Sequence, residues 1–90
     1  MSTSLKGFVI YKNRNEVILD VNGVGYQIFV SKKLLELIGP AQDTSEQVHR
    51  VTTFLDVKEN SLTLYGFIDE KEKEIFKLLI SVNGIGPRMA

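Results

Sequence analysis

The stretch "VNGVGY" at residues 21–26 joins two runs in which every second residue is apolar. The runs are "EVILDV" (16–21) and "GYQIFV" (25–30), and strict alternation of this kind is typical of strands with one buried face. Between them, Asn22 and Gly23 tolerate the positive φ angles that a two-residue hairpin requires. The stretch therefore predicts a tight antiparallel hairpin.

Three further runs bring the number of predicted strands to five: "LKGFVIYK" (5–12), "VHRVTTFLDV" (48–57) and "SLTLYGF" (61–67). In the second of these runs, Val51, Leu55 and Val57 share one side by alternation. The third is rich in the β-branched and aromatic residues that strands favour. Most of the chain is therefore predicted to be sheet.

A short helix is predicted between the third and fourth strands, over "SKKLLELIGP" (31–40). Ser31 can accept hydrogen bonds at its N-terminus, Gly39 can close its C-terminus, and Pro40 prevents its continuation. The stretch that follows, 41–47, has no apolar periodicity and is predicted to be a loop.

A second helix is predicted from residue 69, where the apolar period changes from 2 to 3.6. In "DEKEKEIFKLLI" (69–80), Asp69 and Glu72 have the spacing of a capping box, and acidic residues crowd the first turns. The apolar stripe of this helix comprises Ile75, Phe76, Leu79 and Ile80.

The composition of the 90-residue chain excludes several classes of function. The formal net charge is zero, so any contact with nucleic-acid phosphates would have to be local. There is no cysteine, no phosphate-binding G-x-x-x-x-G-K-[ST] motif and no apolar run near the ~20 residues of a membrane span. We expect no catalytic residue, no metal and no cofactor, and His49, the only histidine, is predicted to lie on the surface or on a strand face.

The letters VNG recur in "VNGIGP" (82–87), but here they follow a helix and precede Pro87, which is favoured at the first position of a new helix. The two glycines would then bring backbone N–H groups to a helix N-terminus, which attracts anions. Arg88 can add a charge-assisted contact. From spacing alone, the link is either a phosphate site or only a sharp turn between helices.

Three motifs and their mutual spacing closely resemble the N-terminal part of the RuvA family: "VNGVGY", "LYGF" (64–67) and "EIFKLLISVNGIGPRMA" (74–90). Members of this family recognise junctions in the bacterial Holliday junction branch-migration complex. The resemblance covers the chain except for its variable 31–47 region. It implies a mainly β fold, with a five-stranded OB-type barrel domain over 1–68 and the beginning of a helix-hairpin-helix DNA-binding domain over 69–90.

The resemblance also implies a mode of action. The first hairpin of the helix-hairpin-helix domain would grip DNA through its backbone, and it comprises Asn83, Gly84, Ile85, Gly86 and Arg88. The family is cytoplasmic, is not itself enzymatic, and assembles as a homotetramer or octamer on Holliday junction DNA with the RuvB ATPase and the RuvC resolvase. RuvA proteins continue well beyond this point, so the chain is expected to be a fragment that lacks the second hairpin motif and the RuvB-binding domain.

The loop between the fourth and fifth strands is a further feature that the resemblance singles out. Family members carry two acidic residues there, and in the tetramer these loops meet at the centre of the open junction as an acidic pin. Here the loop contains Lys58, Glu59 and Asn60, so the first acid is kept and a neutral amide replaces the second. This departure leaves the strength of the pin open. Without the resemblance, such polar residues would indicate only a solvated hairpin tip.

Two other functions stay open at this point. An OB barrel can bind single-stranded nucleic acid through exposed aromatic residues, and Tyr26, Tyr65 and Phe67 either form such a platform or belong to the core. Alternatively, the barrel binds another protein and has no role with nucleic acid. A preference for four-way junctions over single strands would separate the first two functions.

Overall fold

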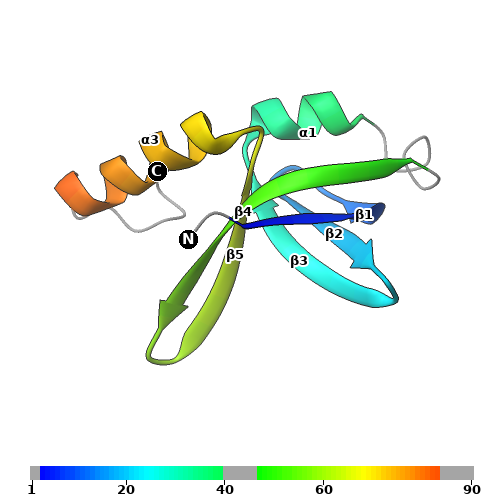
Figure 1. Cartoon of the computed structure of the whole chain (residues 1–90), viewed down its shortest axis with the longest axis horizontal. Helices are drawn as coiled ribbons and strands as arrows, with labels where there is room; N and C mark the ends of the chain where they lie inside the picture. Colours follow the sequence, from blue (N-terminus) through cyan, green and yellow to red (C-terminus); the bar gives the residue numbers. More distant parts are fainter. Residues whose placement is uncertain (1–2, 40–46, 84–90) are drawn as a thin grey trace.

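Five strands form a closed barrel in the computed structural model, which describes residues 3–39 and 47–83, the last two by their backbone alone (Figure 1). The strands are β1 (Thr3–Lys12), β2 (Glu16–Val21), β3 (Val24–Val30), β4 (Val48–Lys58) and β5 (Ser61–Phe67). Their order around the barrel is β1-β2-β3-β5-β4, and every neighbouring pair is antiparallel except β3 and β5. The OB-type five-stranded barrel is confirmed, and the predicted strand ends shift by no more than two residues.

The turn between β2 and β3 is the two-residue hairpin that the sequence predicts. Asn22 and Gly23 have φ angles of 53° and 91°, and Val21 pairs directly with Val24. The Gly23 N–H also donates a hydrogen bond of 2.8 Å to the Asp20 carboxylate, which fixes the turn from outside the barrel.

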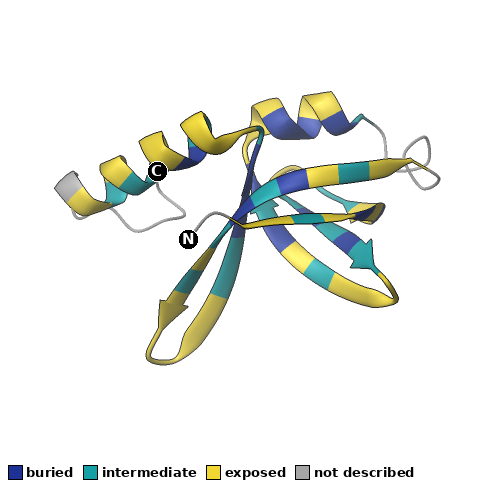
Figure 2. Ribbon diagram, viewed as in Figure 1, coloured by how far each residue is buried: buried dark blue, intermediate teal, exposed yellow. Residues whose placement is uncertain are grey.

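The hydrophobic core fills the barrel and continues beneath a short helix, α1 (Lys32–Ile38), which lies across one end (Figure 2). The strands contribute Val9, Val17, Leu19, Ile28, Val30 and Val51, and the helix contributes Leu34, Leu35 and Ile38. The predicted caps of α1 are confirmed, since Ser31 Oγ accepts a hydrogen bond from the Leu34 N–H and Gly39 has a φ of 82°. Lys12 donates from Nζ to the carbonyls of Leu35 and Gly39, so its charge complements the negative C-terminal end of the helix dipole.

The motif "LYGF" has a steric explanation at Gly66. A Cβ atom at this position would lie 2.7 Å from Val51 Cγ1 and 2.8 Å from Ile28 Cγ2. Gly66 therefore leaves room for the core side chains of Val51 and Ile28, at the point where the parallel pairing of Ile28–Val30 with Leu64–Gly66 closes the barrel.

A second helix, α3 (Glu70–Asn83), follows β5 after a short connection. Its N-terminus is capped by the Asp69 carboxylate, which accepts a hydrogen bond of 2.9 Å from the Glu72 N–H as predicted. The reciprocal bond differs from the usual capping box: Glu72 accepts from the Ile68 N–H, at 3.0 Å, and not from that of Asp69. The cap therefore also fixes the residue that leaves the sheet.

An aromatic cluster outside the barrel holds α3 against the sheet. The Phe76 ring lies 5.1 Å from that of Phe67, 5.3 Å from that of Tyr65 and 6.3 Å from that of Phe54, measured between ring centroids. Tyr65 and Phe67 are buried, but beneath α3 and not in the barrel core, which Tyr26 contacts. Of the two alternatives left open by the sequence, the structure therefore favours burial, but it places Tyr65 and Phe67 under α3 and only Tyr26 against the barrel core.

The stripe on α3 is covered only in part. Phe76 and Ile80 are half-buried, whereas Ile75 and Leu79 are 51% and 40% exposed. A single helix packed on the outside of a small barrel contacts the sheet along a narrow line, so part of its apolar face stays open among the described residues.

Candidate nucleic-acid interface

The β4–β5 hairpin projects beyond the barrel as a two-stranded ribbon, seen at the lower left of Figure 1. Within the described residues, β4 pairs with β1 only as far as Thr53, and β5 pairs with β3 only from Leu64 onwards. Between these points the two strands pair with each other alone. We call this segment, residues 54–63, the ribbon.

One side of the ribbon carries aliphatic side chains that lack a cover. Val51 is buried and shares its side of β4 with Leu55 and Val57, as predicted, but these two are 48% and 65% exposed. Leu62, opposite Val57 on β5, is 71% exposed. The side that faces the core within the barrel therefore continues outward as an exposed apolar surface. Figure 2 shows how the burial of these strands decreases toward the tip of the hairpin.

The tip of the ribbon is the loop that the family resemblance singles out, and all three of its predicted site residues are exposed. Lys58 pairs with Ser61, so Glu59 and Asn60 form the turn. The Lys58 ammonium lies 3.7 Å from the Asp56 carboxylate. Among the described residues, Glu59 has no ion-pair partner, and its carboxylate is presented to solvent at the far end of the ribbon.

The other predicted site follows α3. Asn83 is the last residue of this helix, and its side chain lies outside the described residues. The remainder of the predicted hairpin, Gly84, Ile85, Gly86 and Arg88, also lies outside them. The structure therefore places the last residue of α3, and the hairpin and its phosphate site stay predictions.

The outer face of β2 and β3 does not have the composition of a nucleic-acid platform. Its strands present the carboxylates of Glu16 and Asp20. Glu16 accepts hydrogen bonds from the side-chain amides of Asn13 and Gln27, at 3.0 and 2.8 Å. Because this face presents carboxylates and no cation pairs with them among the described residues, it does not favour phosphates.

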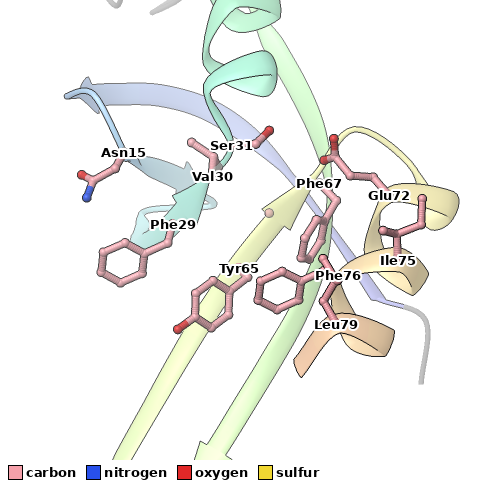
Figure 3. A pocket seen from close by; sticks show the side chains of 11 residues that line it. Asn15, Phe29, Val30, Ser31, Tyr65, Phe67, Glu72, Ile75, Phe76 and Leu79 are labelled. Carbon is pink, nitrogen blue, oxygen red and sulfur yellow. The ribbon is translucent and has the colours of Figure 1, made fainter. Parts of the chain in front are cut away.

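A pocket of about 400 Å³ opens between the sheet and α3 (Figure 3). Phe29, Tyr65 and Phe76 form one wall, and Glu72 supplies the one ionisable carboxylate among its described lining residues. An apolar pocket with a negative charge does not attract phosphate. The alternative of a single-strand platform therefore finds no support here either, because Tyr65 is largely covered by neighbouring rings.

Two polar residues are buried to an extent that the sequence does not indicate, although His49 lies on a strand face as predicted. His49 lies on a strand face, opposite Gly7, and its Nε2 is buried with no hydrogen-bond partner among the described residues. Lys73 is only 1% exposed, although it stands among acidic residues on the predicted solvated turns of α3. Periodicity carries no signal for the burial of such a lysine.

Two classes of site are absent from the part of the chain that the structure describes. Across 3–39 and 47–83, no group of three or more His, Asp or Glu side chains is placed to hold a metal ion. In the same ranges, neither helix combines the length and the hydropathy needed to cross a bilayer.

Comparison with known proteins identifies one family. The model of the RuvA N terminal domain matches residues 1–66. A protein of Christiangramia forsetii named Holliday junction branch migration complex subunit RuvA is 46% identical over 86 residues, which cover 96% of this chain and 42% of that protein. Proteins with the same name from Acetivibrio thermocellus and Flavobacterium psychrophilum are 41% and 43% identical over 90 residues, which cover all of this chain and 43% and 44% of those proteins. The chain thus spans less than half the length of these relatives.

Proposed function

Because the chain belongs to the RuvA N-terminal domain family, we propose that it is the junction-recognising part of a Holliday junction branch-migration complex subunit. The observation that carries this proposal is an identity of 41% or more, over nearly the whole chain, to proteins that bear that name. In this function the chain binds four-way DNA during recombination and repair in the bacterial cytoplasm, and it catalyses no reaction. The RuvB ATPase supplies the motor, and the RuvC resolvase acts on the same junction.

The hairpin after α3 is the proposed phosphate contact. The aromatic cluster around Phe76 and the Asp69 cap hold α3 in a fixed direction against β5, which supports a defined position for the end of that helix. Backbone N–H groups of Gly84 and Gly86 then contact a phosphate, and Arg88 adds a charge. Such contacts read the DNA backbone and are independent of base sequence.

Binding to synthetic junctions tests this contact in a longer protein in which the second helix of the motif is complete. Arg88→Glu is expected to weaken binding equally for junctions with different arm sequences, because it removes a phosphate contact. Gly86→Val is expected to weaken binding as strongly, because a β-branched side chain obstructs both the turn and the approach of the DNA backbone. Lys33→Glu, on the exposed side of α1, is the control. Normal binding by both hairpin variants would reduce this segment to a structural link.

The ribbon is the proposed centre of a tetramer. Its length carries Glu59 away from the barrel, and the exposed side chains of Leu55, Val57 and Leu62 offer an apolar surface for contact between copies. The zero net charge leaves little long-range repulsion to oppose association. Sedimentation over a concentration series is expected to show self-association of this chain. A strict monomer at high concentration would assign the assembly contacts to other segments.

A further inference from the structure

The outer face of β1 and β4 carries two basic residues directly opposite each other. Lys6 and Arg50 are Cα partners in the antiparallel ladder, and both are exposed. Like charges at directly opposed positions destabilise a sheet. A pair of this kind, on a chain with zero net charge, indicates a local attraction for anions.

Neighbouring residues do not neutralise this pair. Among the described residues, neither Lys6 nor Arg50 forms an ion pair within 4 Å. Arg50 donates one hydrogen bond, to Ser4 Oγ at 3.2 Å, which leaves most of its guanidinium N–H groups available. The acid nearest in register is Asp20, opposite Phe8, and its carboxylate accepts the Gly23 N–H.

Apolar side chains continue the same face. Phe8 is 39% exposed and stands opposite Val48, which is 54% exposed. A register shift between Val9 and Tyr11 changes the alternation of β1, and Tyr11 is 47% exposed beyond it. Along β1, Lys6 is thus followed by two exposed aromatic residues, Phe8 and Tyr11, and Arg50 lies beside Lys6 on β4.

The barrel surface is therefore divided by charge. The outer face of β2 and β3 presents Glu16 and Asp20, whereas that of β1 and β4 presents Lys6 and Arg50. A nucleic-acid strand matches the second face in two ways, because its phosphates pair with the cations and its bases or sugars pack on exposed rings. A peptide of acidic residues alone would match only the charges.

We propose that the face of β1 and β4 around Lys6, Arg50 and Phe8 is a DNA contact surface of the barrel, separate from the hairpin after α3 and from the ribbon tip. Lys6 and Arg50 contact phosphates, and Phe8 packs against a neighbouring sugar or base. This inference rests on the proposed function and adds a second, barrel-borne contact to it.

Fluorescence anisotropy with a labelled synthetic four-way junction tests the surface on the 90-residue chain across a salt series. The variant Lys6→Gln/Arg50→Gln is expected to lower the slope of log K against log salt by about 2 and the affinity at the lowest salt by roughly tenfold. The matched control is Lys32→Gln/Lys33→Gln, which removes the same charge from exposed positions on α1. Its slope is expected to change by less than about 0.5.

Two further measurements separate binding from folding and DNA from protein. The melting temperature of Lys6→Gln/Arg50→Gln is expected to equal or exceed that of the wild type, because a like-charge pair has been removed. Phe8→Ala is expected to weaken junction binding several-fold without changing the salt slope, since ring packing releases no counterions. A hepta-glutamate peptide is the probe for an acidic partner, and we expect it not to compete at equal charge concentration.

The possible outcomes distinguish this inference from the proposed function. If Lys6→Gln/Arg50→Gln and the α1 control both bind the junction more weakly than the wild type, and by the same factor, the inference is overturned and the proposed function stays intact. Competition by hepta-glutamate at equal charge concentration would assign the face to an acidic protein and overturn the inference as well. Failure of the wild-type chain to bind any DNA would overturn the inference, whereas the proposed function is overturned only if the longer protein with the complete motif also fails to bind the junction.

Discussion

The β2–β3 and β4–β5 hairpins are built on the same alternation of apolar and polar residues, yet they meet different surroundings. In the first, Val17, Leu19 and Ile28 on the inner side are fully buried. In the second, Val57 and Leu62 on the corresponding side are 65% and 71% exposed. The difference arises because β2 is paired on both edges along its length, whereas the ribbon has no further strand beside it among the described residues.

Alternation therefore specifies which side of a strand is apolar, and strand pairing decides whether that side is covered. A barrel interior exists only where neighbouring strands continue around it. Beyond Thr53 the same pattern produces an exposed apolar surface, which is available for contact with another molecule. In this protein the covered hairpin serves stability, and we infer that the uncovered one serves assembly and DNA.

The largest expected effect compares one leucine from each hairpin. Leu19→Ala is expected to lower the free energy of unfolding by about 3 kcal/mol, because it opens a cavity in a closed core. Leu62→Ala is expected to lower it by less than about 0.5 kcal/mol, because the side chain is already exposed. Urea unfolding at low protein concentration measures both. Equal losses would show that the ribbon is covered in solution, and a dependence on protein concentration would identify a second copy as the cover.

The next effect concerns the closure of the barrel. Gly66→Ala is expected to destabilise the fold by roughly 2 kcal/mol, because the new methyl group overlaps Val51 and Ile28 and the core must shift. Val51→Ala in the same chain removes one overlapping group, so the double variant is expected to lose less than the sum of the two single losses. Ser61→Ala, at the exposed start of β5, is the control. Strict additivity in urea unfolding would contradict the steric explanation of the "LYGF" motif.

A smaller effect is expected at the link between β1 and α1. Lys12→Met keeps the aliphatic stem but removes the hydrogen bonds of 2.8 and 2.6 Å to Leu35 O and Gly39 O, so we expect a loss of roughly 1 kcal/mol. Amide hydrogen exchange at Gly39, which donates to Leu35 O, is expected to accelerate as the helix end frays. Lys12→Arg retains the charge and is the matched control. Unchanged exchange in Lys12→Met would mean that α1 is held by its buried leucines alone.

Much of the fold is predictable from the sequence because its signals are local. Alternation, the Asn22–Gly23 turn, the caps of α1 and the Asp69 cap each involve residues close along the chain. The two separate cores and the uncovered ribbon depend on which strands pair, which local patterns do not contain. The exposure of Ile75 likewise depends on how narrowly α3 contacts the sheet.

The candidate sites, like the fold, are predictable from the sequence only where their signals are local. The tip residues 58–60 follow from a family motif, and the structure adds that they stand at the end of a projecting ribbon. The pairing of Lys6 with Arg50 could not be predicted, because the two residues are far apart in sequence and meet only through the register of β1 and β4. The proposed phosphate hairpin over 83–88 stays a prediction.

The smallest expected effect is at the ribbon tip, where the comparison between the two hairpins becomes functional. Each Glu59 carboxylate at ~10 Å from a phosphate is repelled by only ~0.4 kcal/mol in water, before salt screening. Lys58 is engaged with Asp56, so it offsets the Glu59 charge less than its position in the sequence suggests. In a complete tetramer at low salt, Glu59→Gln is expected to tighten junction binding about twofold to fivefold, which corresponds to several such pairs acting together. Asn60→Asp is expected to weaken binding by a similar factor, because it restores the second acid of the family loop.

The control for this comparison is Asn22→Asp, at the tip of the β2–β3 hairpin. It adds the same charge and is expected to change binding less, since that turn is not proposed to face the junction centre. Junction affinity across a salt series decides the matter: no effect of either ribbon variant at the lowest salt, or weaker binding by Glu59→Gln, would make the tip an ordinary solvated turn.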